Sequence, residues 1–211
     1  MTIVKTCGKL YWAGEYAILE PGQLALIKAI PIYMTAEIKA SNDYRLYSDM
    51  FSYSVDLRPD SSYALIQETV ALVEEYLTTQ GVELQPFSLD IRGKMEREGK
   101  KFGLGSSGSV VVLVIKAMLA FYERLADREL LFKLASAVLL KRGDNGSMGD
   151  IACIVSEDLV LYQSFDREKV ADWLEKENLQ VVLARDWGFS IRSVEPALKF
   201  DFLVGWTKEV A

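Results

Sequence analysis

The sequence contains no histidine and only two cysteines among its 211 residues. Without histidine, Ser-His-Asp and Cys-His catalysis, zinc sites with an imidazole ligand and any imidazole general base are excluded. Cys7 and Cys153 lie far apart in apolar surroundings, which predicts two buried, reduced thiols. Catalysis by this chain would therefore depend on carboxylates, lysines, hydroxyls and backbone amides.

Long apolar runs and an excess of positive charge are also missing. The longest apolar stretch, residues 110–115, is too short to span a bilayer, and residues 1–14 lack the apolar core of a signal peptide. We therefore expect a cytoplasmic protein. The net charge of −6 argues against non-specific nucleic-acid binding, which needs a basic surface. It is compatible with an anionic small substrate, because a local group of lysines and arginines can dominate inside a cleft.

Half of the residues are hydrophobic, and their patterning predicts a mixture of strands and helices in a soluble globular chain. Apolar residues at helical spacing predict a helix that begins at Ser61 or Ser62 and ends at Gly81. Segment 110–125 carries apolar residues on every side and predicts a buried helix, and Asp127 and Asp166 are expected to cap helices ending near residues 140 and 177. Strands are predicted at residues 2–7, 32–39, 44–48, 52–56 and 87–91.

Two further strand predictions concern the second half of the chain. Residues 151–155 and 159–165 predict a β-hairpin that turns at residues 156–158. Residues 202–206 predict a strand a few positions before the last residue, Ala211, with nothing after it to pair with it. We therefore expect one domain over residues 1–200 and the first strand of a truncated second lobe over residues 201–211.

Residues 103–109 combine three glycines and three serines directly before the predicted buried helix. Glycines let successive backbone amides approach a ligand, and the start of a helix adds about half a positive charge, which suits phosphate oxygens. Serine hydroxyls can bind Mg²⁺, and Lys100 and Lys101 add positive charge upstream. The loop therefore favours binding of a nucleoside triphosphate.

Other types of loop share some of these features. A tight turn with a serine cap is the structural alternative. Gly103, Gly105 and Gly108 also satisfy the G-x-G-x-x-G pattern of a dinucleotide site, but residues 98–101 are not the apolar strand that such a site requires. A Walker loop is excluded because no glycine is followed by Lys-Ser or Lys-Thr in the required pattern.

Two other segments combine glycine with charged residues. Lys9 precedes Gly14 and Glu15, and a solvated lysine at a strand end is the alternative to an active-site role. Residues 141–150 end at Asp150, directly before a segment predicted to be an apolar strand, where a charge is costly. The alternative for this second segment is an ordinary turn that ends a helix.

The Gly-Leu-Gly-Ser-Ser sequence at residues 103–107 resembles the second motif of the GHMP kinases, a family that includes galactokinase, homoserine kinase and mevalonate kinase. Residues 9–19 resemble the first motif of that family, and residues 141–150 resemble the substrate loop of its mevalonate-type members. Gly108 replaces the usual alanine, a departure we expect to leave phosphate contacts unaffected. Together with residues 185–190, these segments are most similar to the bacterial phosphomevalonate kinases of Gram-positive cocci.

The resemblance implies an α+β fold, the GHMP kinase amino-terminal lobe (ribosomal protein S5 domain 2-like), with a mixed or antiparallel sheet and buried helices. It implies that residues 201–211 begin a carboxy-terminal ferredoxin-like lobe. The implied reaction moves the γ-phosphoryl group of ATP, with Mg²⁺, onto (R)-5-phosphomevalonate in the mevalonate route to isoprenoids. The alternatives are mevalonate kinase, another small-molecule kinase of the family, and an inactive nucleotide-binding fragment.

The resemblance also assigns roles to individual residues. Lys9 and Asp150 are the implied catalytic residues, and we expect them to pair. Ser107 is the implied protein ligand of Mg²⁺. The acceptor is expected to contact Lys9, Arg142, Ser147 and Asp150. The residues expected at the phosphates of ATP are Lys101, Gly103, Leu104, Gly105, Ser106, Ser107, Gly108 and Ser109.

Overall fold

One long strand lies at the centre of the sheet of this protein. The computed structural model describes residues 1–93, 95–97, 100–198 and 201–205. Strand β2 (Leu24–Ala40) pairs along most of its length with β1 (Thr2–Ala13). Its first half also pairs with β8 (Leu159–Gln163), and its second half with β5 (Phe87–Arg92). Because β2 bonds to three neighbours, it fixes how the two halves of the chain meet.

Shorter strands extend the sheet on both sides. The order is β4-β3-β5-β2-β8-β9, where β3 is Arg45–Ser48, β4 is Ser54–Val55 and β9 is Ser190–Ser193. Strands β3 and β5 are parallel and the other pairs are antiparallel, so the expected mixed sheet is confirmed. Strands β6 (Glu96–Arg97) and β7 (Lys100–Lys101) form a separate two-stranded sheet just before the glycine-serine loop.

Strand β1 continues well beyond the predicted segment 2–7 because its second half pairs with β2. The register shifts between Cys7 and Gly8, opposite the unpaired Pro31 of β2. Proline has no N–H to donate, so a bulge is the position that a sheet tolerates for it. After the bulge, side chains alternate again between the two faces of the sheet as far as Tyr11, and a second register shift lies between Tyr11 and Ala13.

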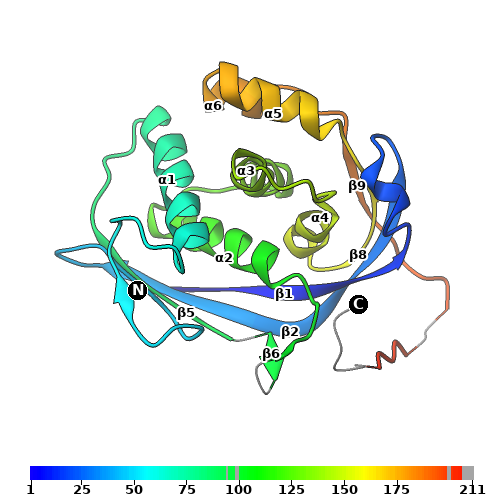
Figure 1. Cartoon of the computed structure of the whole chain (residues 1–211), viewed down its shortest axis with the longest axis horizontal. Helices are drawn as coiled ribbons and strands as arrows, with labels where there is room; N and C mark the ends of the chain where they lie inside the picture. The colour runs from blue at the N-terminus through cyan, green and yellow to red at the C-terminus, as the bar shows by residue number, and fades with distance from the viewer. Residues whose placement is uncertain (94, 98–99, 199–200, 206–211) are drawn as a thin grey trace.

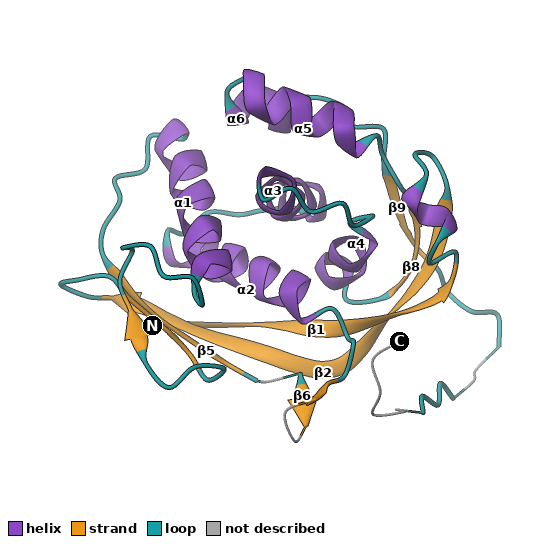
Figure 2. Ribbon diagram, in the orientation of Figure 1, coloured by secondary structure: helices purple, strands orange, loops and turns teal. Residues whose placement is uncertain are grey.

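The helices cover one face of the curved sheet (Figure 1). Helices α2 and α4 contact β1 and β2 directly, and α3 packs against both of them. Helix α1 contacts α2 and α3, while α5 and α6 form the outer layer beyond α3 (Figure 2). Their bounds are α1 Ala64–Thr79, α2 Ser106–Phe121, α3 Arg128–Lys141, α4 Gly149–Ser156, α5 Arg167–Lys176 and α6 Leu179–Ala184, with a short 3₁₀ turn at Ala17–Leu19.

Most helix predictions are confirmed. Asp127 accepts a hydrogen bond from the Leu130 amide at 2.8 Å and begins α3, and Asp166 begins α5 in the same way. Helix α2 is buried on nearly all sides, as its mainly apolar composition predicts. The predicted serine cap of α1 is wrong, because the carboxylate of Asp60 accepts from the amides that precede that helix.

Two strand predictions are wrong. Residues 151–155 lie in α4, because a short apolar run fits a buried helix as well as a buried strand and its packing against α3 and β8 decides the outcome. Residues 202–205 form no strand, and Trp206 lies outside the described residues.

The prediction of two buried reduced thiols is confirmed, and burial raises the pKa of Cys7 to about 11. Among the described residues, we find no helix that combines the length and apolar character needed to cross a membrane.

Candidate functional site

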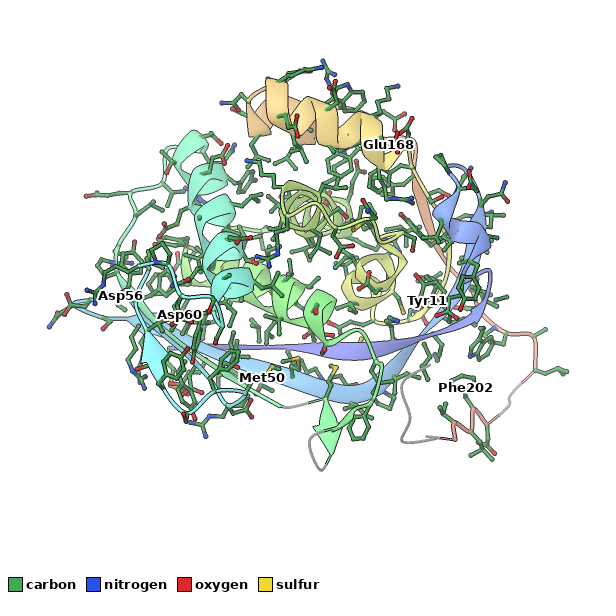
Figure 3. The ribbon with its side chains drawn as sticks, in the orientation of Figure 1. Tyr11, Met50, Asp56, Asp60, Glu168 and Phe202 are labelled. Atoms are coloured by element: carbon green, nitrogen blue, oxygen red, sulfur yellow. The ribbon has the colours of Figure 1, made fainter. Side chains whose placement is uncertain are left out.

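Strand β1 presents two neighbouring side chains to the beginnings of two helices. Lys9 and Tyr11 are two positions apart and therefore point to the same face of the sheet, toward the starts of α2 and α4. Figure 3 labels Tyr11 on this strand. The stem of Lys9 passes over Gly105 at the start of α2, where a Cβ atom would come within 2.8 Å of its Cε. The hydroxyl of Tyr11 lies directly against Gly149 at the start of α4. The two glycines thus leave room for the two side chains.

The glycine-serine loop is fastened to the same strand. The Lys9 amide donates to the carbonyl of Leu104 at 2.9 Å, and the side chain of Leu104 is buried over Gly8. Gly103 and Gly105 have φ angles of 75° and 78°, a left-handed conformation that side chains other than glycine adopt at a cost. These two positions let the chain leave β7 and enter α2 within a few residues.

The first turn of α2 offers backbone amides to an anion. The first bond along the helix runs from the Ser109 amide to the Gly105 carbonyl at 3.0 Å, so the amides of Ser106, Ser107 and Gly108 precede the intrahelical pattern. The helix dipole adds positive potential at the same point. Ser107 is exposed and Ser106 is partly exposed, which leaves both hydroxyls accessible.

Two of the residues expected at the phosphates have other partners. The Ser109 hydroxyl donates to the carbonyl of Cys7 at 2.8 Å, and the Ser109 carbonyl accepts from Thr6. Ser109 is therefore a buried link between α2 and β1, because position 109 faces the sheet one turn into the helix. Leu104 likewise serves to anchor the loop through its carbonyl and its buried side chain.

The loop fits a magnesium ion that arrives with a nucleotide. Mg²⁺ keeps several waters and usually takes only one or two protein ligands beside phosphate oxygens. The exposed hydroxyl of Ser107 at the start of α2 can supply one such ligand. Within the described residues, no group of three or more acidic, cysteine or histidine side chains forms a ready-made metal site.

Asp150 lies in the first turn of α4 and faces the first turn of α2. Its Oδ1 accepts from the Ile151 amide at 2.9 Å, and a Cβ atom on Gly108 would come within 2.7 Å of its Oδ2. Glycine at position 108 therefore lets the carboxylate approach α2. The departure from the family's alanine thus bears on Asp150, a consequence we had not expected.

Burial raises the pKa of Asp150 above its ordinary value. The positive charge of Lys9 and the Ile151 amide oppose that rise, whereas the carboxylate of Asp144 adds to it. The direct pair expected between Lys9 and Asp150 is absent from the ion pairs of the described residues. The Lys9 ammonium lies instead 5.0 Å from the centroid of the Tyr11 ring and acts on the carboxylate through space.

Ser147 is held from three sides in the turn before α4. Its hydroxyl and that of Tyr11 lie 3.0 Å apart, and the Gly149 amide donates to the same Ser147 oxygen at 3.2 Å. The hydroxyl of Tyr162 donates to the Ser147 carbonyl at 2.9 Å. Met148 completes the turn with a left-handed φ of 61°. The turn that precedes Asp150 is therefore fixed by tyrosines from β1 and β8.

The structure does not bring every predicted residue to this cluster. The guanidinium of Arg142 pairs with Glu68 of α1, so tertiary packing commits it elsewhere. Lys101 lies in β7, but its side chain belongs to the part of the chain that is not described. Sequence reasoning missed Tyr11 and Gly149. The signal for Tyr11 was its spacing of two from Lys9, which becomes informative only when β1 is extended past residue 7.

Asp150→Asn is expected to stabilise the folded protein at neutral pH while leaving its stability at pH 3.5 nearly unchanged. Because burial raises the pKa of Asp150 in the folded state, the ionised carboxylate costs stability as pH rises above the pKa of the unfolded chain. Asparagine cannot ionise, so the gain should appear above about pH 4. Urea midpoints of both proteins between pH 3.5 and 7 measure this difference, and a constant difference across the range would contradict it.

Comparison with known proteins finds a family profile that covers part of this chain. The sequence profile of the GHMP kinases N terminal domain matches residues 64–158. The chain is 29% identical to the phosphomevalonate kinase of Streptomyces sp. (strain CL190), over all of this chain and 63% of that protein. The chain therefore spans less than two thirds of that relative.

Solved structures agree with this assignment. A structure of Streptococcus pneumoniae phosphomevalonate kinase in complex with phosphomevalonate and AMPPNP is 74% identical, with a TM-score of 0.99 over all of this chain and 64% of that one. The Lin0012 protein of Listeria innocua is 32% identical, with a TM-score of 0.87 over 92% of this chain and 57% of that one.

Proposed function

Because the chain carries the N-terminal domain of the GHMP kinases, we propose that it contributes to the ATP-dependent phosphorylation of (R)-5-phosphomevalonate to 5-diphosphomevalonate. The observation that carries this proposal is the convergence of Lys9, the first turn of α2 and Asp150 in one place. It is supported by the 74% identity to an enzyme that binds phosphomevalonate and AMPPNP.

In the proposed arrangement the ATP phosphates lie at the first turn of α2. The amides of Ser106, Ser107 and Gly108 would bind phosphate oxygens, and the Ser107 hydroxyl would bind Mg²⁺. The metal ion supplies charge neutralisation on the phosphates when it is bound. Phosphoryl transfer of this kind depends mainly on positioning and electrostatic stabilisation, which backbone amides and a lysine can provide without a covalent step.

The acceptor determines what the side chains must do. A phosphate monoester has a second pKa of about 6, so its attacking oxygen is largely deprotonated at neutral pH. A strong general base is then less important than relief of the repulsion between two anionic substrates. Lys9 supplies that positive charge, and Asp150, on which Lys9 acts through space, orients the acceptor. The raised pKa of Asp150 agrees with a carboxylate placed in a dry, crowded site.

A second candidate function is binding of nucleotide without turnover. The observation that favours it is the length of the chain, which spans 64% of the phosphomevalonate kinase structure. Catalysis requires every group that touches the acceptor, whereas the first turn of α2 can bind phosphates by itself.

An assay of ADP release by the 211-residue chain separates these functions. We expect turnover with phosphomevalonate to exceed turnover with mevalonate or diphosphomevalonate at least tenfold in kcat/KM. Titration calorimetry with AMPPNP and Mg²⁺ measures nucleotide binding independently. Binding without ADP release from any acceptor would favour the second candidate, and faster turnover of mevalonate would overturn the proposed acceptor.

A further inference from the structure

Tyr11 lies between the two parts of the site and contacts both of them. Its ring lies under the Lys9 ammonium, 5.0 Å from the nitrogen. Its hydroxyl lies 3.0 Å from the Ser147 hydroxyl and directly against Gly149. The side chain of Tyr11 therefore reaches both the lysine and the turn before Asp150.

We propose that Tyr11 is a positioning residue with two separable actions: its ring holds the Lys9 ammonium, and its hydroxyl orients the Ser147 hydroxyl toward the acceptor. This inference rests on the proposed function, because it assigns the acceptor phosphate to the side of the site where Ser147 lies.

The hydroxyl action follows from counting hydrogen-bond donors and acceptors. The Ser147 oxygen already accepts from the Gly149 amide, so one lone pair and one hydrogen remain on it. Burial raises the pKa of Tyr11 to about 12, so at neutral pH its hydroxyl keeps a hydrogen to donate. When Tyr11 donates to Ser147, the serine hydrogen is left free for an anionic oxygen of the acceptor. Such a chain of donors strengthens as the terminal acceptor gains charge.

The ring action follows from the position of the lysine. The Lys9 stem already lies over Gly105, which restricts it on one side. The face of the Tyr11 ring attracts a cation and restricts the ammonium at the other end. A long lysine side chain otherwise samples many rotamers, and fixing it before the substrates bind reduces the entropy lost in the transition state.

Two substitutions separate the actions. Tyr11→Phe keeps the ring and removes the hydroxyl, and we expect KM for phosphomevalonate to rise about tenfold with kcat changed less than about twofold. Tyr11→Leu removes both, and we expect the same rise in KM together with a fall of about tenfold in kcat. Tyr33→Leu is the matched control, because Tyr33 lies 4.5 Å from the Lys5 ammonium in the same sheet but outside the site. It should leave both parameters unchanged.

A double variant and a spectroscopic measurement complete the test. If the hydroxyl acts through Ser147, Tyr11→Phe should add nothing to KM once Ser147→Ala is present, and this comparison does not require Tyr11→Leu to fold. In ¹H–¹³C spectra, the Lys9 ε-protons should lose their ring-current shift in Tyr11→Leu and keep it in Tyr11→Phe.

Additive effects of Tyr11→Phe and Ser147→Ala would overturn the hydroxyl action. Equal kcat values for the Phe and Leu variants, or an unchanged Lys9 shift in Tyr11→Leu, would overturn the ring action. The Lys9 spectrum requires no turnover, so it decides the ring action even if ADP release by the wild-type chain fails. If ADP release fails, the hydroxyl action is tested by titrating phosphomevalonate into the wild type, Tyr11→Phe and the double variant. Weaker binding to Tyr11→Phe than to the wild type supports the hydroxyl action, and equal affinity overturns it.

Discussion

Lys9→Met is expected to lower kcat for phosphomevalonate by about 10²–10³-fold, and Asp150→Asn by only about tenfold. Under the proposed function the acceptor oxygen is already ionised, so the main barrier is repulsion between the two substrates. Methionine keeps the length of the lysine side chain over Gly105 and removes only its charge. ADP release at saturating phosphomevalonate and ATP measures both effects.

Lys5→Met is the matched control for this prediction. Lys5 lies on the same strand and also places its ammonium over a tyrosine ring, but its side chain is exposed away from the helices. It should leave kcat within about twofold of the wild-type value, as surface lysines far from a site do. If Asp150→Asn proved more damaging than Lys9→Met, proton removal by Asp150 would replace charge neutralisation as the leading contribution.

Local sequence was sufficient to predict the conformation of the loop proposed to bind phosphates. The glycines and serines of residues 103–109 adopt their conformation for reasons contained within the segment, because left-handed backbone and a helix start are both local properties. Helix α2, which is mainly apolar, could be predicted in the same way, since burial on nearly all sides needs no partner to be specified. The resemblance to the GHMP kinases then gave Lys9 and Asp150.

The proposed acceptor half depends on contacts between distant segments, which local sequence patterns do not report. Residues 151–155 were predicted as a strand because a short apolar run carries no period that separates the two structures. Arg142 appeared available in the sequence, but its partner Glu68 comes from a different helix. Tyr11 was overlooked because the pairing that extends β1 to Ala13 involves residues of β2.

Gly14→Ala is expected to destabilise the protein by about 4 kcal/mol, whereas Gly143→Ala should cost only about 1 kcal/mol. Both glycines have left-handed φ angles, 83° and 75°, so the conformational penalty is similar. Their surroundings differ. A Cβ atom at Gly14 would collide with the carbonyl oxygen of Leu24 and come within 2.9 Å of the Ala25 Cα, whereas nothing lies within 4 Å of the same atom at Gly143.

The collision at Gly14 cannot be relieved by rotating a side chain. Leu24 and Ala25 belong to β2 and pair with β8, so moving their backbone would break hydrogen bonds of the sheet. Urea unfolding followed by the fluorescence of the protein's four tryptophans measures both variants, with Gly143→Ala reporting the conformational penalty alone. Equal losses of unfolding free energy in Gly14→Ala and Gly143→Ala would mean that the end of β1 moves away from β2. The same movement would displace Lys9 and Tyr11, so a stable Gly14→Ala protein should then bind phosphomevalonate more weakly than Gly143→Ala.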